Sequence, residues 1–367
     1  MKPFSPIYYV KENKTKCILL IFMLFLSYAV YLGGLYVTNV RDNWNYMIDN
    51  QEQCVAVYSQ NADTEGEALK AFARQVEKEG RAEVIWLGKY NGLHWESIMG
   101  FESGTAACTF CSVTDFKKYC EFLGINCAFD KLKSGSFVLS DRFAKNLDLK
   151  LGDKIDPDYD GNIYGEYTLD ALTEEEGYCQ YYIDESNKNS GGLMLIGKEK
   201  DGETIRGQAL LDYAKQLQQQ FDVLIGESAA KRLDKQLNPL HTIYIFLVFL
   251  IAVIMAVTIN AAFIGMYQKR EYEFAVYRAI GISKPAMAGK IAGELLVMDM
   301  IALVLGAGVS MLFLYLYNNF VLYPVGKYLR YFHPVALLGL LVCNVTVVVP
   351  LMVTRCKSLT RADICDY

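Results

Sequence analysis

Hydrophobic residues gather in four long runs along the chain, separated by stretches of ordinary polar composition. A helix needs about 20 apolar residues to cross the hydrocarbon core of a bilayer, and each run is long enough to do so. The runs are Cys17–Val37, Ile243–Met266, Ile291–Tyr317 and Val335–Thr354. The first run is about twice as long as the apolar core of a signal peptide, so we expect an uncleaved anchor. The pattern predicts an integral membrane α-helical protein with four transmembrane helices.

About 200 residues between the first and second runs have the patterns of a mixed α/β domain. Helical spacing marks residues 65–80, 140–149 and 207–220, and strand-like runs mark 83–87, 136–139, 193–196 and 222–225. Because helices and strands alternate, we expect helices that cover one face of a sheet. Ser140 stands where a side chain caps a helix N-terminus. The helical ends, 40–50 and 228–238, are expected to extend the first two spans as a stalk.

Lysine and arginine residues near the spans set the expected orientation, because basic residues stay on the cytoplasmic side. They precede the first span, lie between the second and third, and follow the fourth, whereas only Lys327 and Arg330 lie between the third and fourth. The predicted order is cytoplasmic N-terminus 1–16, transmembrane helix 17–38, extracytoplasmic domain 39–240, transmembrane helix 241–266, cytoplasmic segment 267–290, transmembrane helix 291–317, outer loop 318–334, transmembrane helix 335–354 and cytoplasmic tail 355–367. The expected location is therefore a cell membrane, with both termini inside the cell.

Net charge is divided unequally between these regions. Residues 39–240 carry 22 basic and 34 acidic residues, 22 − 34 = −12, and the remainder carries 14 − 7 = +7. An acidic outer domain argues against nucleic acid as a partner and against a clamp on an anionic lipid surface.

An acidic loop at 156–166 resembles a calcium-binding loop in the spacing of Asp156, Asp158 and Asp160. Its Glu166 stands at position eleven of the loop, whereas the calcium ligand is expected one residue later. The alternative is a polar hairpin turn, which we favour because the displaced carboxylate breaks the ligand geometry. We therefore expect no metal site beyond this weak candidate.

Residues 192–199 fit the first part of a phosphate-binding loop, but Glu199 replaces the hydroxyl residue that would hold magnesium. The apolar middle of this stretch suits a buried strand. The three histidines, His94, His241 and His333, are far apart in sequence, and no hydrolase motif is present. We expect no catalytic residues, no cofactor in this chain and no enzymatic activity of its own.

Six cysteines fall in the outer domain, where an oxidising environment permits disulfides. A zinc site at the Cys108–Cys111 pair is disfavoured because the spacing that follows is irregular and no histidine is near. Disulfides and free thiols both stay open, and the connectivity cannot be read from the spacing. The candidates are Cys54, Cys108, Cys111, Cys120, Cys127 and Cys179.

Two acidic residues, Glu294 and Asp299, fall in the third span, where a charge is costly and suggests a function. Glu294 is near the cytoplasmic end of the span and can reach the interface. Asp299 lies deeper, and it serves either an internal function or a structural pair with a hydroxyl or a lysine. Gly289, Gly293, Gly306 and Gly308 form small-residue patches that let helices approach closely.

The charged segment 268–281, between the second and third spans, has the pattern of a short amphipathic helix. Helical spacing puts one stripe at Tyr272, Ala275, Val276, Ala279 and Ile280, and a charged aromatic face at Arg270, Glu273, Phe274, Tyr277 and Arg278. Gly281 is expected to end the helix. The segment is either a docking element or a solvated linker.

Three stretches together resemble the FtsX-like or MacB-like permeases of ABC transporters, the mechanotransmission class. The stretch 273–281 is similar to the family's pattern after the second span, and 138–155 resembles its outer-domain signature of strand, helix and Gly-Asp turn. Pro350, Arg355 and Leu359 look like the proline and basic tail after the last span. The tail beyond residue 361 departs from the family, as does the stretch after Asp153.

The resemblance implies a dimeric permease, a homodimer or a heterodimer, that binds a separate cytoplasmic ABC ATPase, which holds the ATP and magnesium. It implies that Arg270, Glu273, Phe274, Tyr277, Arg278 and Gly281 couple the chain to that ATPase. The expected function is export or extraction of peptides, antimicrobial compounds or lipids, driven by movement of the outer domain. The alternative is an FtsX-type regulator of a cell-wall hydrolase, or a signalling protein, without transport. An extracytoplasmic adaptor or hydrolase is a further expected partner.

Overall fold

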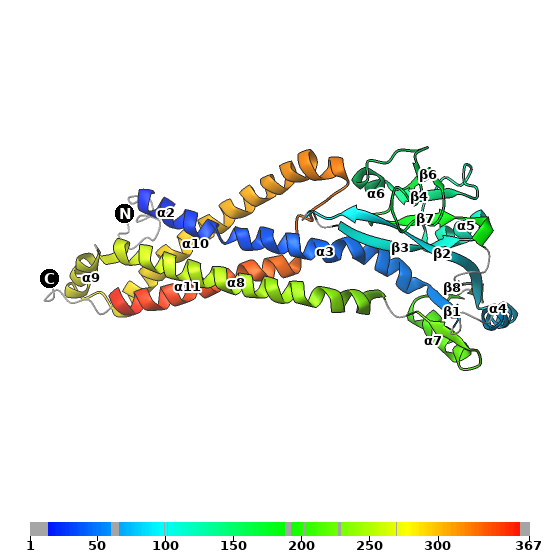
Figure 1. The fold of residues 1–367 in the computed structure, drawn as a ribbon. Coiled ribbons are helices and arrows are strands. Elements are labelled where there is room, and N and C mark those ends of the chain that lie inside the picture. The colour runs from blue at the N-terminus through cyan, green and yellow to red at the C-terminus, as the bar shows by residue number, and fades with distance from the viewer. Residues whose placement is uncertain are drawn as a thin grey trace. The chain divides into compact units, whose positions relative to one another are not determined.

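A computed structural model describes residues 14–59, 66–98, 100, 102–187, 192–200, 203–226, 229–268 and 270–359. The chain divides into two compact units (Figure 1). Unit 1 contains residues 1–38, 239–317 and 329–367, and unit 2 contains residues 39–238 and 318–328. The division assigns the connection between the last two long helices to unit 2.

Unit 1 is helical. Its elements are α2 (Lys14–Phe25), the start of α3 (Tyr28–Gln53), most of α8 (Ala229–Gln268), α9 (Glu271–Ala279), α10 (Lys284–Tyr317) and α11 (Pro334–Leu359). Within the described residues, three stretches are long and apolar enough to cross a membrane, namely Leu237–Ala261, Lys284–Val325 and Pro334–Ser358. They correspond to the second, third and fourth predicted spans.

The first predicted span is broken in the structure. α2 ends at Phe25 and α3 begins at Tyr28, and the hydroxyl of Ser27 donates to the carbonyl of Leu24 at 2.7 Å. This side-chain bond competes with the helical ladder and favours a turn there. A fourth uninterrupted span at 17–38 therefore stays a prediction.

Glycines let the helices of unit 1 approach closely at two points. The ring of Tyr28 lies against Gly306 of α10, where an added Cβ would overlap it, and the Tyr28 hydroxyl donates to the carbonyl of Leu303 at 2.7 Å. The hydroxyl of Tyr244 occupies the space beside Gly34 and Gly339 in the same way. The small-residue patch at Gly306 thus serves close packing of helices within the chain.

Unit 2 is built on a nine-stranded mixed sheet. Its strands are β1 (Val55–Ser59), β2 (Ala82–Glu96), β3 (Glu102–Phe110), β4 (Ser136–Ser140), β5 (Lys154–Ile155), β6 (Tyr167–Thr173), β7 (Gln180–Ile183), β8 (Gly192–Gly197) and β11 (Val223–Ile225). The order is β11-β1-β8-β2-β3-β7-β4-β6-β5, and only the β3–β7 and β4–β6 pairs are parallel. A separate two-stranded sheet joins β9 (Glu199–Lys200) and β10 (Glu203–Thr204).

Most of the elements predicted in this region form as expected. α4 (Glu67–Glu79) buries the predicted stripe of Leu69, Phe72, Ala73 and Val76. α6 (Asp141–Asn146) begins after Ser140, whose hydroxyl accepts from the amide of Phe143. α7 (Gln208–Gln218), β4, β8 and β11 also lie where the pattern places them. The apparent phosphate loop is the buried strand β8, as its apolar middle predicts.

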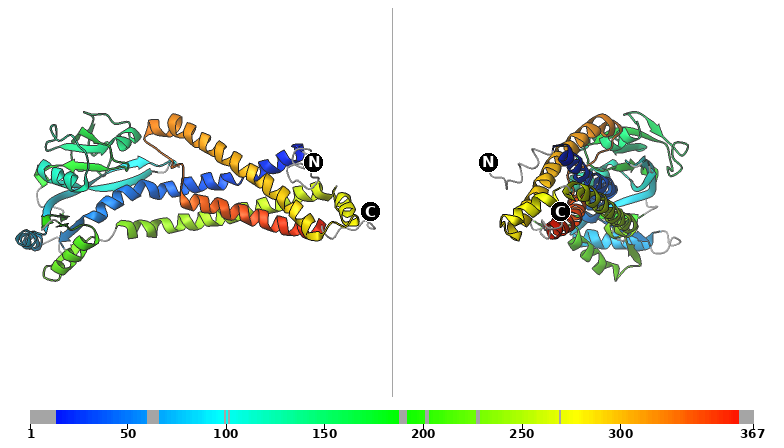
Figure 2. Two further views of the ribbon diagram at one scale, coloured as in Figure 1. Left: turned by 180° about the vertical axis from the view of Figure 1, so that it is seen from behind. Right: turned by 90° about the vertical axis from the view of Figure 1, so that its left-hand side faces the viewer.

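The expectation that helices cover one face of the sheet is wrong. Alternate residues of β8 point to opposite faces. Leu193 and Leu195 pack in a core with α4 and α7, whereas Met194 and Ile196 pack in a core with α5 (Val113–Leu123). Figure 2 shows α4 and α7 at the same end of the sheet. The sheet needs cover on both faces here because β8 is apolar on both of its sides.

The two predicted stalk segments are helical and pack on one another within unit 2. Ile48 of α3 lies in one apolar cluster with Leu233 and Leu237 of α8. Arg41 pairs with Asp234 at 3.0 Å on the surface of the same contact.

Candidate functional site

The short helix α9 lies between two of the candidate membrane helices, α8 and α10. It ends as predicted at Gly281, which has a φ of +86°, a left-handed conformation that favours glycine. The amide of Gly281 donates to the carbonyl of Arg278, and the amide of Ile282 donates to the carbonyl of Tyr277, both at 3.0 Å. These bonds satisfy the last carbonyls of the helix and turn the chain toward α10.

Arg270, at the start of α9, joins this helix to α10 through buried ion pairs. Its guanidinium contacts Glu273 at 2.8 Å and Glu294 of α10 at 2.7 Å. The ammonium group of Lys290, which is also in α10, lies 3.4 Å from the carboxylate of Glu294. Glu294 is fully buried, and the side chains of Arg270 and Lys290 are 9% and 4% exposed. We call these four residues the α9–α10 charge cluster.

Two aromatic rings complete the charge cluster. Phe274 is fully buried, and the Arg270 guanidinium lies over its ring at 5.1 Å. The hydroxyl of Tyr277 donates to Glu273 at 2.9 Å, and its ring stands edge-on to Phe274 at 5.9 Å. The rings exclude water from the ion pairs, which strengthens each of them.

The surroundings of Phe274 correct the predicted faces of α9. Phe274 and Ala275 are the buried residues of the helix, whereas Tyr272 and Ile280 are 61% and 69% exposed. The face expected to meet a partner, with Arg270 and Phe274, is packed inside this chain. The predicted helical spacing is correct, but Arg270 and Phe274 pack inward because Arg270 pairs with Glu294 of α10.

The pKa values of the cluster record this mutual dependence. Burial opposes the charge of Arg270, but hydrogen bonds and the charges of Glu273 and Glu294 outweigh it and raise the pKa of Arg270. Burial likewise opposes the charge of Glu273, yet Arg270 and Tyr277 lower the pKa of this carboxyl. Burial and the bond to Glu273 raise the pKa of Tyr277 to about 12. Both shifts favour the charged forms of Arg270 and Glu273 at neutral pH.

Asp299, deeper in α10, lies apart from the charge cluster. It is 6% exposed and accepts a 2.8 Å hydrogen bond from the amide of Asn344 in α11. The partner is an amide, whereas a hydroxyl or a lysine was expected. The bond ties α10 to α11, and both the structural and the functional interpretation of Asp299 stay open.

Two members of these sites escaped the sequence reasoning. The first is Lys290. It stands four residues before Glu294 on one helix, and this spacing, which favours an ion pair, was a usable signal. Asn344 lies 45 residues after Asp299, and no local pattern links the two.

The acidic loop at 156–166 joins the antiparallel strands β5 and β6. Asp156 accepts from the amides of Asp158 and Tyr159, and Asp160 accepts from both the amide and the ring of His94. Glu166 pairs with Lys154. Among the described residues, no group of three or more histidine, cysteine or acidic residues is placed to hold a metal ion. Asp156 and Asp160 accept hydrogen bonds from backbone amides of the turn, and both the hairpin turn and the calcium loop stay predictions.

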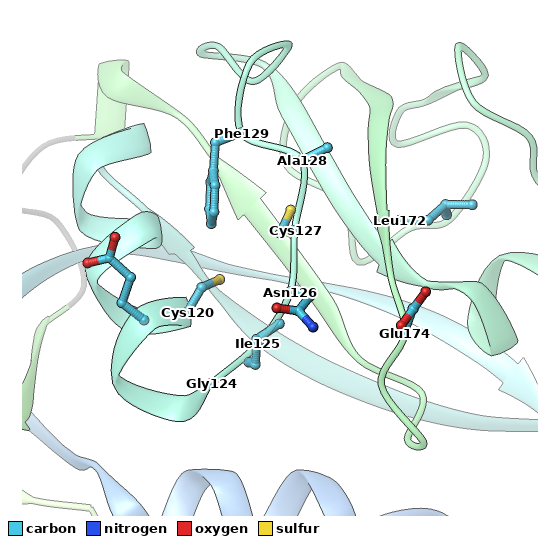
Figure 3. A pocket seen from close by; sticks show the side chains of 10 residues that line it. Cys120, Gly124, Ile125, Asn126, Cys127, Ala128, Phe129, Leu172 and Glu174 are labelled. Atoms are coloured by element: carbon cyan, nitrogen blue, oxygen red, sulfur yellow. The ribbon is translucent and has the colours of Figure 1, made fainter.

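A surface cavity of about 610 Å³ lies at the C-terminal end of α5, and Cys120 and Cys127 both line it (Figure 3). These two residues, with Cys54 and Cys179, are free thiols in the structure. The side chain of Cys108 lies outside the described set, and Cys111 is buried. Burial, with the nearby charge of Cys127, raises the pKa of Cys120, and burial raises the pKa of Cys127 to about 11.

Among the cysteines of unit 2 whose side chains the structure describes, we expect Cys127 to react first when the purified protein is treated with iodoacetamide, because the others are buried. The thiolate is the nucleophile, so labelling of Cys127 should rise about tenfold per pH unit between pH 8 and pH 10. Peptide mass spectrometry measures both the order and the pH dependence. A Cys120–Cys127 bridge in protein purified without reductant would contradict the thiol state.

Together, the apolar helices and the charge cluster indicate a membrane protein. A short charged helix connects two of its candidate spans along the chain and is bonded to the second of them. Residues 244–359 match the family model of the FtsX-like permease C-terminal domain, which covers α9, α10, α11 and most of α8. This C-terminal part of the chain is similar to the FtsX-like permeases of ABC transporters. Such permeases are non-enzymatic transporter components that work with an ATPase partner. No curated protein matches the chain.

Proposed function

We propose that this chain is the permease subunit of an ABC transporter in which a separate cytoplasmic ATPase drives movement of the α/β unit. The observation that carries the proposal is the α9–α10 charge cluster within the family match. It fixes α9 to the start of a candidate span, so a force applied to α9 reaches α10 with little loss. A separate ATPase beside the membrane would need such a rigid contact, because we expect no nucleotide site in this chain.

The exposed side of α9 is the proposed ATPase contact. Tyr272 and Ile280 are exposed large apolar residues at opposite ends of the helix, and Arg278 is partly exposed between them. Aromatic and arginine residues are enriched where interfaces gain most of their energy. Arg270, Glu273, Phe274 and Tyr277 act from behind this surface by holding the helix, and Gly281 ends it. Of the expected coupling residues, the proposal thus keeps Arg278 as a contact and gives the others a supporting role, and it adds Tyr272 and Ile280 as contacts.

The double variant Tyr272→Ala with Ile280→Ala is expected to weaken copurification with the ATPase by about 2–4 kcal/mol, because it removes the two exposed anchors. Tagged permease and ATPase are coexpressed, purified in detergent and titrated against each other. The matched control is Tyr164→Ala, which removes an equally exposed tyrosine from unit 2. Undiminished binding of the double variant would show that α9 is not the contact.

We further propose that α9 lies in the cytoplasm and that unit 2 lies on the outer side of the membrane. The functional form is proposed to be a dimer that, like MacB-like permeases, moves cargo on the outer side of the membrane. The charge distribution supports this, since groups of basic residues lie before the first span, between the second and third, and after the fourth, whereas only Lys327 and Arg330 lie between the third and fourth. The proposed cargo is a peptide, an antimicrobial compound or a lipid. The chain itself is expected to hydrolyse no ATP.

The proposal is tested by purifying the tagged permease from membranes of its own host and identifying copurifying chains by mass spectrometry. We expect an ABC ATPase in a fixed ratio, with ATP hydrolysis that vanishes when its own catalytic residue is changed. Purification of a cell-wall hydrolase without any ATPase would contradict transport and favour the regulatory alternative.

A further inference from the structure

The connection between α10 and α11 is folded into the α/β unit. Residues 318–328 belong to unit 2, although the helices on either side of them belong to unit 1. The connection forms η2 (Asn318–Leu322) and η3 (Tyr323–Val325), and the stacked rings of Tyr323 and Tyr328 close it at 5.5 Å. We call residues 318–328 the connecting segment.

Arg142 of α6 holds the connecting segment. Its Nε donates to the carbonyl of Gly326 at 2.9 Å. Its two terminal nitrogens donate to the carbonyl of Glu176 at 2.8 Å and to the side chain of Asn43 in α3 at 2.7 Å. The guanidinium also lies 4.6 Å from the ring centre of Tyr178. One side chain thus joins the connecting segment to two other parts of unit 2, a use to which the planar guanidinium is suited.

Gly326 is shaped for this contact. Its carbonyl accepts a second bond, at 3.0 Å, from the hydroxyl of Tyr178, which is fully buried. Its φ of +64° is left-handed, and an added Cβ would overlap the carbonyl oxygen of Arg142. A glycine is therefore required both by the backbone conformation and by the close approach of α6.

Other bonds extend the contact along the connecting segment. Lys327 pairs with Glu96 at 3.0 Å, and the side chain of Asn146 donates to the carbonyl of Val325 at 3.3 Å. The side chain of Asn39 donates to the carbonyl of Tyr328 at 2.6 Å. Lys327 is 9% exposed, so its ion pair is shielded from solvent on the lysine side. The segment is thus fastened to the rest of unit 2 through its last four residues, 325–328.

We infer that Arg142 is a positioning residue that couples α10 and α11 to the sheet of unit 2 through the connecting segment. The chain crosses between the two units at 38–39 and 238–239 as well. Without the Arg142 contact, the segment would keep the bonds of Tyr178, Glu96, Asn146 and Asn39 but lose the side chain that joins it to two other parts of unit 2, and part of a displacement of α10 or α11 would be lost in it. This inference rests on the proposed function for its purpose, since it needs an ATP-driven displacement to transmit.

The test is hydrogen exchange on the purified full chain in detergent, with Arg142→Ala as the first variant. We expect exchange of the peptide that covers 318–328 to rise about tenfold or more, because release of the segment exposes its backbone bonds. Arg142→Lys should give an intermediate rise, since lysine keeps the charge but cannot reach three acceptors in one plane. Gly326→Ala should produce the same rise, because it disrupts the same contact at the residue that accepts the bond from Arg142. This second variant keeps the test possible if Arg142→Ala does not fold.

The matched control is Arg206→Ala. Arg206 also stacks on an aromatic ring of unit 2, 4.4 Å from the centre of Phe122, and donates to Gln53. Neither of these partners is in the connecting segment. An unchanged exchange rate at 318–328 in Arg142→Ala, or an equal rise in Arg206→Ala, would overturn the inference.

A second measurement separates this inference from the proposed function. In the complex with the ATPase, ATP should change the exchange of β4 and β6 in the wild type, and Arg142→Ala should remove at least half of that change while ATP hydrolysis persists. Persistence of the full ATP effect in Arg142→Ala would overturn the coupling role. If no ATPase binds the wild type at all, the proposed function fails, and the coupling role, which needs its displacement, fails with it. The exchange of the chain alone still decides whether Arg142 anchors the segment.

Discussion

Arg270→Ala is expected to lower the free energy of unfolding by about 3–5 kcal/mol, because it removes a positive partner, at 2.7 Å, from the fully buried carboxylate of Glu294. Lys290 would remain beside Glu294 at 3.4 Å, and the hydroxyl of Tyr277 would remain beside Glu273 at 2.9 Å. Thermal unfolding of the detergent-purified protein measures the loss. We also expect the loss of ATPase copurification, since α9 would no longer be fixed to α10.

A surface ion pair provides the control for Arg270→Ala. Arg41 and Asp234 are bound at 3.0 Å, but their side chains are 45% and 50% exposed, so Arg41→Ala should cost about 0–1 kcal/mol. Adding Glu294→Gln to Arg270→Ala should recover part of the stability, because it removes the uncompensated buried charge. Equal losses in Arg41→Ala and Arg270→Ala would mean that the cluster is no tighter than a surface pair.

Phe274→Ala is expected to cost about 3–5 kcal/mol of unfolding free energy, the range for removing a buried aromatic side chain. Phe274 is fully buried and supports both Arg270 and Tyr277. The cavity left behind would admit water to the ion pairs and weaken them as well. Denaturant or thermal unfolding in mixed micelles gives the value.

Tyr272→Ala separates packing from docking, because Tyr272 is 61% exposed on the same helix. We expect it to change the unfolding free energy by less than about 0.5 kcal/mol while it weakens ATPase binding. The opposite result, a stable Phe274→Ala and an unstable Tyr272→Ala, would contradict the packing of α9 described above.

Local patterns predicted much of the fold because the burial of a single helix or strand is written in its own periodicity. The stripe Leu69, Phe72 and Val76 of α4 is spaced for one helix face, and that face is buried. Ser140 precedes a helix and caps it, and Gly281 follows one and ends it. Strands β1, β3, β6 and β7 were not predicted, although the buried positions of β6 alternate along the strand and were a usable signal.

Pairs that join distant residues were beyond the sequence. Arg270 and Glu294 are 24 residues apart, and Arg142 and Gly326 are 184 residues apart. A single sequence shows which side chains can pair, but the partner depends on which helices lie side by side. The two faces of the sheet at β8 were misjudged for the same reason, since the apolar run fits cover on either side.

By itself, the sequence determined the apolar helices, the acidic α/β region between the first two runs and a short charged helix that Gly281 ends. Those features depend on composition and on spacing within one element. Only the tertiary structure decided that Phe274 packs inward while Tyr272 faces outward, and that the connecting segment belongs to the α/β unit. Both outcomes depend on charged partners contributed by other elements, Glu294 to Arg270 in the first case and Arg142 to the carbonyl of Gly326 in the second. The physical reason is that amphipathic spacing limits the faces a helix can bury, whereas the choice among them is made by the groups that it meets.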